Sequence, residues 1–346
     1  MRAMVLRGKT LSIEEVERPV PGPGQVLARV LACGICGSDL HAARFMGDMM
    51  ASASAGGRKT WYDVNPAQGI VMGHEFVAEV VETGPGAESF TPGTRVTSIP
   101  VLVAPESPSG FQSIGYSPVV PGAYGEYVVM SAPLLLRVPE NLESKIAATT
   151  EPSAVGLHAV REAGLAADDR VLVMGAGPIG LMTLLWLKKE GLSNVAISDP
   201  SPERRALAGR LGADQVINPA KEDVADAFSG ARNGAQPNVV FECVGVPGTL
   251  SEAMALVQVR GKVVVVGVCM QEDTIRPMVG INKQLTMKFV LGYSAAEYAE
   301  ALGALADGSV NTEPLVTRTI TLDELPGAFM ALADAKDCKV VVLPNG

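Results

Sequence analysis

The stretch Arg170-Val-Leu-Val-Met-Gly175-Ala-Gly177-Pro178-Ile179-Gly180-Leu-Met182 decides how the second half of this chain folds. An apolar run of strand length breaks into three glycines at G-x-G-x-x-G spacing and continues as an apolar run suited to a buried helix. In such a turn Gly175 permits the bend, Gly177 lets the backbone approach a pyrophosphate, and Gly180 lets helix and strand pack closely. The pyrophosphate then lies on free N–H groups at the helix N-terminus. A structural turn without a ligand is the alternative.

A second apolar strand follows and ends in an acid, Asp199. This residue stands about 20 positions beyond Gly180, where a carboxylate is expected to meet the adenosine ribose. A carboxylate there repels a 2′-phosphate, which favours NAD over NADP. Arg204 and Arg205 follow closely, and an arginine can accommodate that phosphate, so NADP stays open as the second choice.

Composition excludes several classes of protein. The length of 346 residues suggests about two domains. A net charge of −9 argues against nucleic acid or an anionic membrane as partner. The N-terminus lacks the apolar core of a signal peptide, and the chain has no apolar run of spanning length. Five cysteines, an odd number, then predict reduced thiols and a cytoplasmic protein.

The two halves of the chain show different periodicities. Short alternating runs separated by Pro-Gly turns over residues 1 to 150 predict a barrel-like all-β domain. From Arg170, strands alternate with helices, which predicts a doubly wound parallel sheet with its ligand at the C-terminal strand ends. Val244 and Val268 would join the glycine turn there. The expected strands are 170–174, 194–198, 214–217, 238–242, 262–267 and 285–291.

Reactive side chains concentrate in Cys33-Gly-Ile-Cys36-Gly-Ser38-Asp39-Leu-His41. The C-x-x-C has three interpretations: half of a zinc ribbon, a redox pair, or one metal ligand with partners distant in sequence. No second C-x-x-C exists, and this one does not open a thioredoxin-like unit. Among three histidines, His74 stands beside Glu75. A thiolate, an imidazole and carboxylates converging on one ion would make an open zinc site, and Asp39 could orient the histidine.

These motifs in combination resemble the zinc-dependent medium-chain dehydrogenases, in particular the polyol and butanediol branch. The resemblance covers essentially the whole chain. It implies an α/β protein with a GroES-like β-barrel catalytic domain and a Rossmann domain with a doubly wound parallel sheet. The catalytic domain would be discontinuous, over 1–151 and 293–346, and the Rossmann domain would cover 152–292. The motifs are Gly34-Ile-Cys36-Gly-Ser38-Asp39-x-His41, Gly73-His74-Glu75, Glu151-Pro152 and the glycine turn.

The resemblance also implies the site. Cys36, His74 and either Glu75 or Glu151 would hold a catalytic zinc, and family members differ in which glutamate binds directly. Ser38 would be the first hydroxyl of a proton relay, and His41 would pass the proton to solvent, since imidazole exchanges protons near neutral pH. A homodimer or homotetramer would form through strand pairing over 275–291. The expected dinucleotide contacts are Gly175, Gly177, Pro178, Ile179, Gly180, Asp199, Arg204, Val244 and Val268.

Three features depart from the resemblance or are left open by it. Residues 101–116 lack the cysteines of a structural zinc lobe, so we expect one catalytic zinc and no structural one, with Phe111 and Tyr116 packing the loop in place. The stretch 42–70 is long: it is either a surface excursion with its own contacts or a lid over the substrate. Lys339 either reaches the pyrophosphate or is simply exposed.

The expected activity is reversible hydride transfer between a secondary alcohol or polyol and NAD, with a small alcohol or ketone as the substrate. Two alternatives stay open. Zinc-free relatives with this architecture reduce enones and quinones with NADPH, but they lack the ligand set seen here. A nucleotide-binding protein without catalysis would bind NAD and turn over no alcohol.

Overall fold

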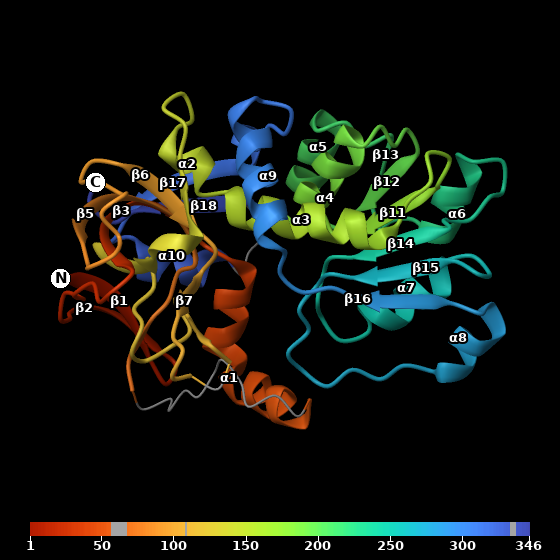
Figure 1. The fold of residues 1–346 in the computed structure, drawn as a ribbon. Coiled ribbons are helices and arrows are strands. Elements are labelled where there is room, and N and C mark those ends of the chain that lie inside the picture. Colours follow the sequence, from red (N-terminus) through yellow and green to blue (C-terminus); the bar gives the residue numbers. More distant parts are fainter. Residues whose placement is uncertain (57–67, 108, 333–336) are drawn as a thin grey trace. The chain divides into compact units, whose positions relative to one another are not determined.

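The computed structural model describes residues 1–56, 68–107, 109–332 and 337–346 (Figure 1). The chain divides into two compact units. In the part of the chain that is described, no helix is both long enough and apolar enough to cross a membrane. The first unit comprises Met1–Glu151 and Val316–Gly346, and the second comprises Pro152–Leu315.

The chain returns to the first compact unit at Val316, whereas the resemblance predicts a domain boundary at residue 293. The reason is helix α9 (Ala295–Ala306), which packs within the second unit against α3 (Thr150–Ala163). Side chains of α9 bind side chains of α3 through two contacts, His158 with Glu297 and Arg161 with Glu300.

The first unit is β-rich, as its alternating runs predict. Its main sheet is centred on β3 (Gln25–Gly34), which pairs with β5 (Glu75–Thr83), β9 (Tyr127–Ser131) and β18 (Lys339–Leu343). The sheet order is β10-β6-β5-β3-β18-β17, with β9 also on β3, and a separate sheet has the order β2-β1-β4. The remaining elements are β1 (Arg2–Arg7), β2 (Thr10–Glu15), β4 (Ile70–Val71), β6 (Arg95–Ser98), β7 (Val101–Val103), β8 (Phe111–Ser113), η1 (Ala132–Leu134), β10 (Leu135–Arg137), α2 (Ser144–Ala147), β17 (Val316–Thr321) and α10 (Leu325–Ala331).

The second unit is a parallel sheet with the order β13-β12-β11-β14-β15-β16, which confirms the predicted doubly wound architecture. Apolar side chains of the sheet, such as Leu172 and Val240, are fully buried against Phe228 and Val257. The elements are β11 (Val171–Met174), α4 (Pro178–Lys189), β12 (Val195–Ser198), α5 (Pro202–Arg210), β13 (Gln215–Ile217), α6 (Val224–Gly230), β14 (Val239–Glu242), α7 (Thr249–Leu256), β15 (Lys262–Val265), α8 (Pro277–Lys283), β16 (Thr286–Phe289), α9 and η2 (Glu313–Leu315).

The structure shows which elements are formed by the described part of residues 42–70 and by residues 101–116. The first part of 42–70 continues helix α1 (Gly37–Ala55), which kinks at Phe45 and buries Met49, whereas Trp61 and Tyr62 lie outside the described residues. The cysteine-free segment forms a hairpin of β7 and β8. Tyr116 is buried, as expected, but Phe111 is 43% exposed, so the prediction that Phe111 packs this loop in place is wrong.

Candidate metal centre and nucleotide-binding turn

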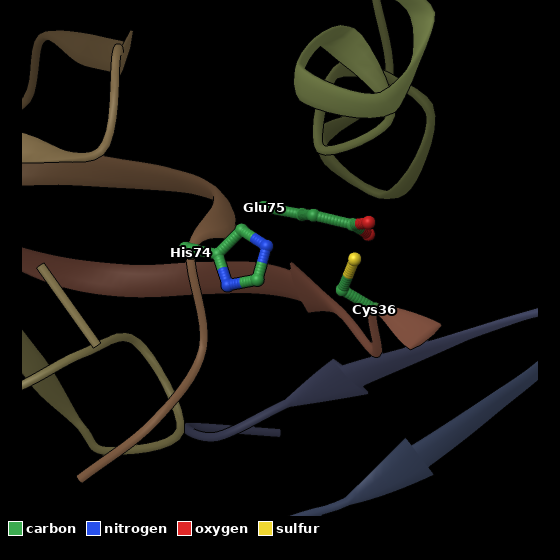
Figure 2. A group of neighbouring side chains, drawn as sticks. All are labelled: Cys36, His74 and Glu75. Atoms are coloured by element: carbon green, nitrogen blue, oxygen red, sulfur yellow. The ribbon is translucent and has the colours of Figure 1, made fainter. Parts of the chain in front are cut away.

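The pairing of β3 with β5 brings the expected ligands together. Gly34, the last residue of β3, lies opposite Glu75, the first residue of β5. Cys36 follows β3 as the N-cap of α1, and His74 precedes Glu75. Ligand atoms of Cys36, His74 and Glu75 lie within 4.8 Å of one another (Figure 2). Glu151 is buried in the first turn of α3 and is not part of this cluster.

Two glycines make room for these side chains. A Cβ on Gly34 would lie 2.0 Å from Oε2 of Glu75, so a side chain there would displace the carboxylate. Gly73 has a φ of +95°, and a Cβ there would lie 2.7 Å from the backbone nitrogen of Tyr124. Glycine is therefore required at both positions for steric reasons, and at Gly73 also because L side chains rarely adopt this φ.

His74 is oriented by a buried carboxylate. Nδ1 of His74 lies 3.2 Å from Oδ1 of Asp39, which is fully buried. The hydroxyl of Tyr124 donates to Oδ2 of Asp39 at 2.6 Å. Burial alone would raise the pKa of Asp39, but the charge of His74 and hydrogen bonds from His74, Tyr124 and Tyr116 lower it. Asp39 thus stays ionised, and the other ring nitrogen of His74 faces Cys36 and Glu75 (Figure 2).

Lys339 is buried and forms an ion pair with Glu75. Its side chain is 1% exposed, and Nζ lies 2.7 Å from both carboxylate oxygens of Glu75 and 3.0 Å from the carbonyl oxygen of Ile35. Burial by itself would lower the pKa of Lys339, but the charges of Glu75 and Cys36 raise it, so the lysine remains charged. Exposure of Lys339, one of the two interpretations of the sequence, is therefore wrong.

The thiol of Cys36 belongs to a short chain of hydrogen bonds. The hydroxyl of Ser38 donates to Sγ of Cys36 at 3.2 Å, and the hydroxyl of Tyr116 lies 2.9 Å from Oγ of Ser38. Without a metal, burial and the charge of Glu75 raise the pKa of the Cys36 thiol. Burial also raises the pKa of Cys33 well above its usual range, which agrees with a packing role for that residue.

Sequence reasoning missed both tyrosines of this site. Tyr116 lies beyond the β7–β8 hairpin and was expected only to pack a loop, and Tyr124 belongs to a segment that reads as strand. Lys339 was known only as a single lysine at the start of the last strand. No local pattern marks these residues, because each bonds a residue far away in the sequence. Lys339 arrives on β18, which pairs with β3, whereas Tyr116 and Tyr124 lie outside the strands.

The clustered residues fit a zinc ion. Zinc accepts thiolate sulfur, imidazole nitrogen and carboxylate oxygen in one tetrahedral set, and catalytic sites combine such donors with one open position. The buried carboxylate behind His74 is the kind of partner that fixes the tautomer of a metal-ligating histidine. The carboxylate of Glu75 already forms an ion pair with Lys339. Among the three candidate ligands, Glu75 is therefore the one that already has a cation as its partner.

The glycine turn in the second unit lies between β11 and α4, as predicted. Gly175 has a φ of +90°, and a Cβ on Gly180 would lie 1.9 Å from the carbonyl oxygen of Gly175. Both positions therefore need glycine for reasons inside the protein. Gly177 differs, because among the described residues a Cβ there would meet only Nη1 of Arg204, at 3.9 Å. Pro178 and Ile179 begin α4 directly after it.

The remaining expected contacts lie at the C-terminal ends of neighbouring strands. Asp199 follows β12, and its Oδ2 accepts from the N–H of Ala176 at 2.8 Å. Arg204 lies with Nη1 4.0 Å from the same oxygen. The loops carrying Val244 and Val268 adjoin, since a Cβ on Gly245 would lie 2.7 Å from the nitrogen of Val268.

Comparison with known proteins identifies the family of this chain. Residues 22–140 match the model of the alcohol dehydrogenase GroES-like domain, and residues 178–307 match that of the zinc-binding dehydrogenases. The (R,R)-butanediol dehydrogenase of Bacillus subtilis is 34% identical over 97% of each chain. The sorbitol dehydrogenase of Bos taurus is 30% identical over 96% of this chain and 92% of its own. The crystal structure of 2R,3R-butanediol dehydrogenase from B. subtilis superposes with a TM-score of 0.84 at 32% identity, covering 99% of both chains.

Proposed function

Because this chain belongs to the zinc-binding alcohol dehydrogenase family, whose members are NAD(P)-dependent enzymes acting on alcohols and polyols, we propose that it transfers hydride reversibly between a secondary alcohol carbon of a diol or polyol and NAD. The relatives that match over nearly the full chain are named for a butanediol and for sorbitol. The observation that carries the proposal is the buried cluster of Cys36, His74 and Glu75.

A zinc ion bound by Cys36, His74 and one glutamate supplies a Lewis acid that brings the pKa of a bound hydroxyl toward neutrality. The protein's own groups then hold and move the proton. Ser38, two residues from Cys36, would accept the proton of the substrate hydroxyl while it releases its own proton toward His41. His41 lies one helical turn further along α1 and passes that proton to solvent. Asp39 holds His74 in the orientation that a ligand needs.

The choice of glutamate rests on which carboxylate lies close to Cys36 and His74. Glu75 already neutralises Lys339 with both carboxylate oxygens. Its distance from Cys36 and His74 still makes it the clustered donor in this structure, whereas Glu151 lies outside the cluster. We propose Glu75 as the glutamate that contacts the ion first and Glu151 as the alternative.

We propose NAD over NADP, with the dinucleotide held by the nine residues named for it above. Asp199 supports this choice: it is 4% exposed and its carboxylate accepts from the N–H groups of Ala176 and Ser201, which hold it in place. A carboxylate has about four lone-pair positions, so ribose hydroxyls can still donate to it. A 2′-phosphate would be repelled. Arg204 argues for NADP instead, because an arginine can accommodate a 2′-phosphate.

We propose one zinc per chain. The segment 101–116 contains no cysteine, and the five cysteines of the chain are Cys33, Cys36, Cys243, Cys269 and Cys338. Cys33 is fully buried and does not belong to the ligand cluster. No group of closely spaced cysteines is therefore available for a structural zinc.

The proposed oligomer is a homodimer or homotetramer formed through the last strand of the parallel sheet. Strand β16 ends the sheet order, so one of its edges is unpaired within the described chain. Large apolar side chains around it are 62–75% exposed: Met278, Ile281, Phe289 and Leu291. An unpaired edge beside an apolar face is suited to pairing with a second copy.

The test is metal content combined with an NAD-linked screen of diols and secondary alcohols on purified protein. We expect about one zinc per chain, activity that is lost on chelation and returns with zinc, and a preference for NAD. Cys36→Ser should lose the zinc and the activity. Cys269→Ser, which replaces a half-buried cysteine outside the cluster, should keep both.

Each alternative predicts a different result. A protein that stays metal-free after incubation with zinc and reduces enones with NADPH would belong to the zinc-free reductases. Binding of NAD without turnover of any alcohol would indicate a non-catalytic protein. Two zinc ions per chain would contradict the proposal of a single catalytic site.

A further inference from the structure

The ammonium group of Lys339 makes three contacts, one for each of its protons. Nζ lies 2.7 Å from each carboxylate oxygen of Glu75 and 3.0 Å from the carbonyl oxygen of Ile35. A lysine ammonium has three N–H donors and no acceptor. The carboxylate of Glu75 and the carbonyl of Ile35 therefore use the whole donor capacity of this buried cation.

Strand β18 fixes Lys339 in this position, because it pairs with β3, the strand that leads to Cys36. The N–H of Ile35 donates to the carbonyl oxygen of Val340 at 2.9 Å, and the carbonyl of Ile35 accepts from Nζ of Lys339. Ile35, which precedes Cys36, is thus bonded to β18 through both its N–H and its carbonyl. The ammonium can follow a displaced carboxylate only by giving up its bond to Ile35.

The carboxylate of Glu75 lies between this ammonium and the other candidate zinc ligands. A ligand atom of Glu75 lies within 4.8 Å of those of Cys36 and His74. The backbone of β3 closes another side of the carboxylate, since a Cβ on Gly34 would lie 2.0 Å from Oε2. Glu75 therefore has two possible cationic partners, an ammonium that is part of the protein and a metal ion.

A zinc ion and the ammonium weaken each other's hold on this carboxylate. A carboxylate that is already neutralised by an ammonium is a weaker donor to a metal. Two cations also repel each other strongly in a buried site, where water screens them little. Lys339 therefore stabilises the empty site more than the occupied one. Because such coupling is reciprocal, the ion pair lowers the affinity for zinc by the factor by which zinc weakens the ion pair.

We propose that Lys339 competes with the metal for the carboxylate of Glu75, so that the site binds zinc less tightly than its ligands alone would. This inference rests on the proposed zinc site. It assigns Lys339 no contact with the substrate or the coenzyme. Lys339 is a positioning residue that acts on the metal through Glu75.

The test is the zinc affinity of the complete protein, measured by competition with a chelator of known affinity. We expect Lys339→Met to bind zinc at least tenfold more tightly than the parent and to release it more slowly, since such partners tune metal sites about 10- to 100-fold. Loss of packing alone would weaken zinc binding, so a gain in affinity excludes a merely structural role.

Two further variants accompany this measurement. Lys339→Gln keeps N–H donors without the charge and should also bind zinc more tightly, which tests the inference even if Lys339→Met folds poorly. Lys188→Met is the matched control, because it removes a lysine from a partly exposed ion pair and should leave the zinc affinity unchanged.

The background of Glu75→Gln shows whether the effect passes through the carboxylate. This substitution removes the charge for which the two cations compete. Lys339→Met should therefore tighten zinc binding by a smaller factor in Glu75→Gln than in the parent. An equal factor in the two backgrounds would mean that the lysine acts on the metal directly, and the inference would be wrong.

The outcomes separate this inference from the proposed function. If the parent binds zinc and oxidises alcohols, but the uncharged variants of Lys339 bind zinc equally or less tightly, only the inference fails. If the parent binds zinc and oxidises no alcohol, the proposed function fails, and the zinc affinities alone decide the inference. A parent that takes up no zinc overturns both.

Discussion

Both units of the molecule bury carboxylates, but they neutralise them by different means. In the first unit, Asp39 and Glu75 are fully buried, and their partners are the side chains of His74, Tyr124 and Lys339. These partners come from segments far apart in the sequence, as the bond between Lys339 and Glu75 shows.

In the second unit two buried acids rely on the backbone. Asp199 accepts from the N–H groups of Ala176 and Ser201. Glu242 is 2% exposed and accepts from the N–H groups of Val244 and Gly245, just after it in the chain. A side-chain partner can be removed by one substitution, whereas a backbone N–H stays with nearly any residue. The first site should therefore be fragile to changes in side-chain chemistry, and the second to changes in backbone geometry.

The largest effect is expected when the buried ion pair is broken. Lys339→Met leaves the carboxylate of Glu75 buried without its countercharge, and breaking such a pair costs about 3–5 kcal/mol of folding free energy. Thermal or urea unfolding of the metal-free protein measures this loss. Lys339→Met combined with Glu75→Gln should recover part of it, because no charge is then left unpaired.

Lys188→Met is the matched control for that experiment. It removes a partly exposed pair with Asp214, for which less than about 1 kcal/mol is expected. An equal loss in the two lysine variants would mean that burial does not distinguish the two pairs.

The glycine turn offers an intermediate effect that tests the backbone-built site. Gly180→Ala forces a Cβ against the carbonyl of Gly175 and should destabilise the protein by about 1–3 kcal/mol. Gly177→Ala has room within the protein, so it should leave the melting temperature unchanged and weaken NAD binding, measured by calorimetry. Equal stability losses in the two alanine variants, with equal NAD affinities, would contradict this separation of structural and ligand-imposed glycines.

The smallest effect is expected at Glu297, which combines both kinds of partner. Its carboxylate accepts from the N–H of Ser294 at 2.7 Å and contacts Nδ1 of His158 at 3.1 Å. Burial would raise the pKa of Glu297, but the hydrogen bonds from Ser294 and the contacts with His158 lower it. A lowered pKa means that the ionised form stabilises the fold above the pKa of the unfolded chain, and that this contribution disappears as pH falls through the folded value.

Glu297→Gln should therefore cost about 1 kcal/mol near neutral pH, as for other helix-capping residues, and the difference from the parent should vanish in acid. Unfolding experiments at several pH values measure both. Glu300→Gln, at an exposed position on the same helix, should cost less than about 0.5 kcal/mol at every pH. A loss in Glu297→Gln that does not depend on pH would show that the charge is not the source of its stability.

The nucleotide-binding turn of the second unit could be predicted from the sequence more fully than the metal centre of the first unit. The turn from Gly175 to Gly180 is one continuous segment, and Asp199 directly follows β12, so the spacing in the sequence was enough to predict this site. The pairing of β11 with β12 then places Asp199 beside Ala176. The metal cluster was predictable only because the family motifs point to Cys36, His74 and either Glu75 or Glu151. The partners that hold the cluster, Tyr124 and Lys339, carry no such signal.

The sequence by itself determined the alternation of strands and helices from Arg170 onward, the six-stranded parallel sheet, and the residue types of the ligand cluster. Those features depend on hydrophobic periodicity and on turns a few residues long. Only the tertiary structure decided that Lys339 is buried on Glu75, that Tyr116 reaches Ser38, and that α9 stays with the second unit. The physical reason is that a buried polar group must find a partner wherever strand pairing and helix packing bring one, and that choice is not made between neighbours in the chain.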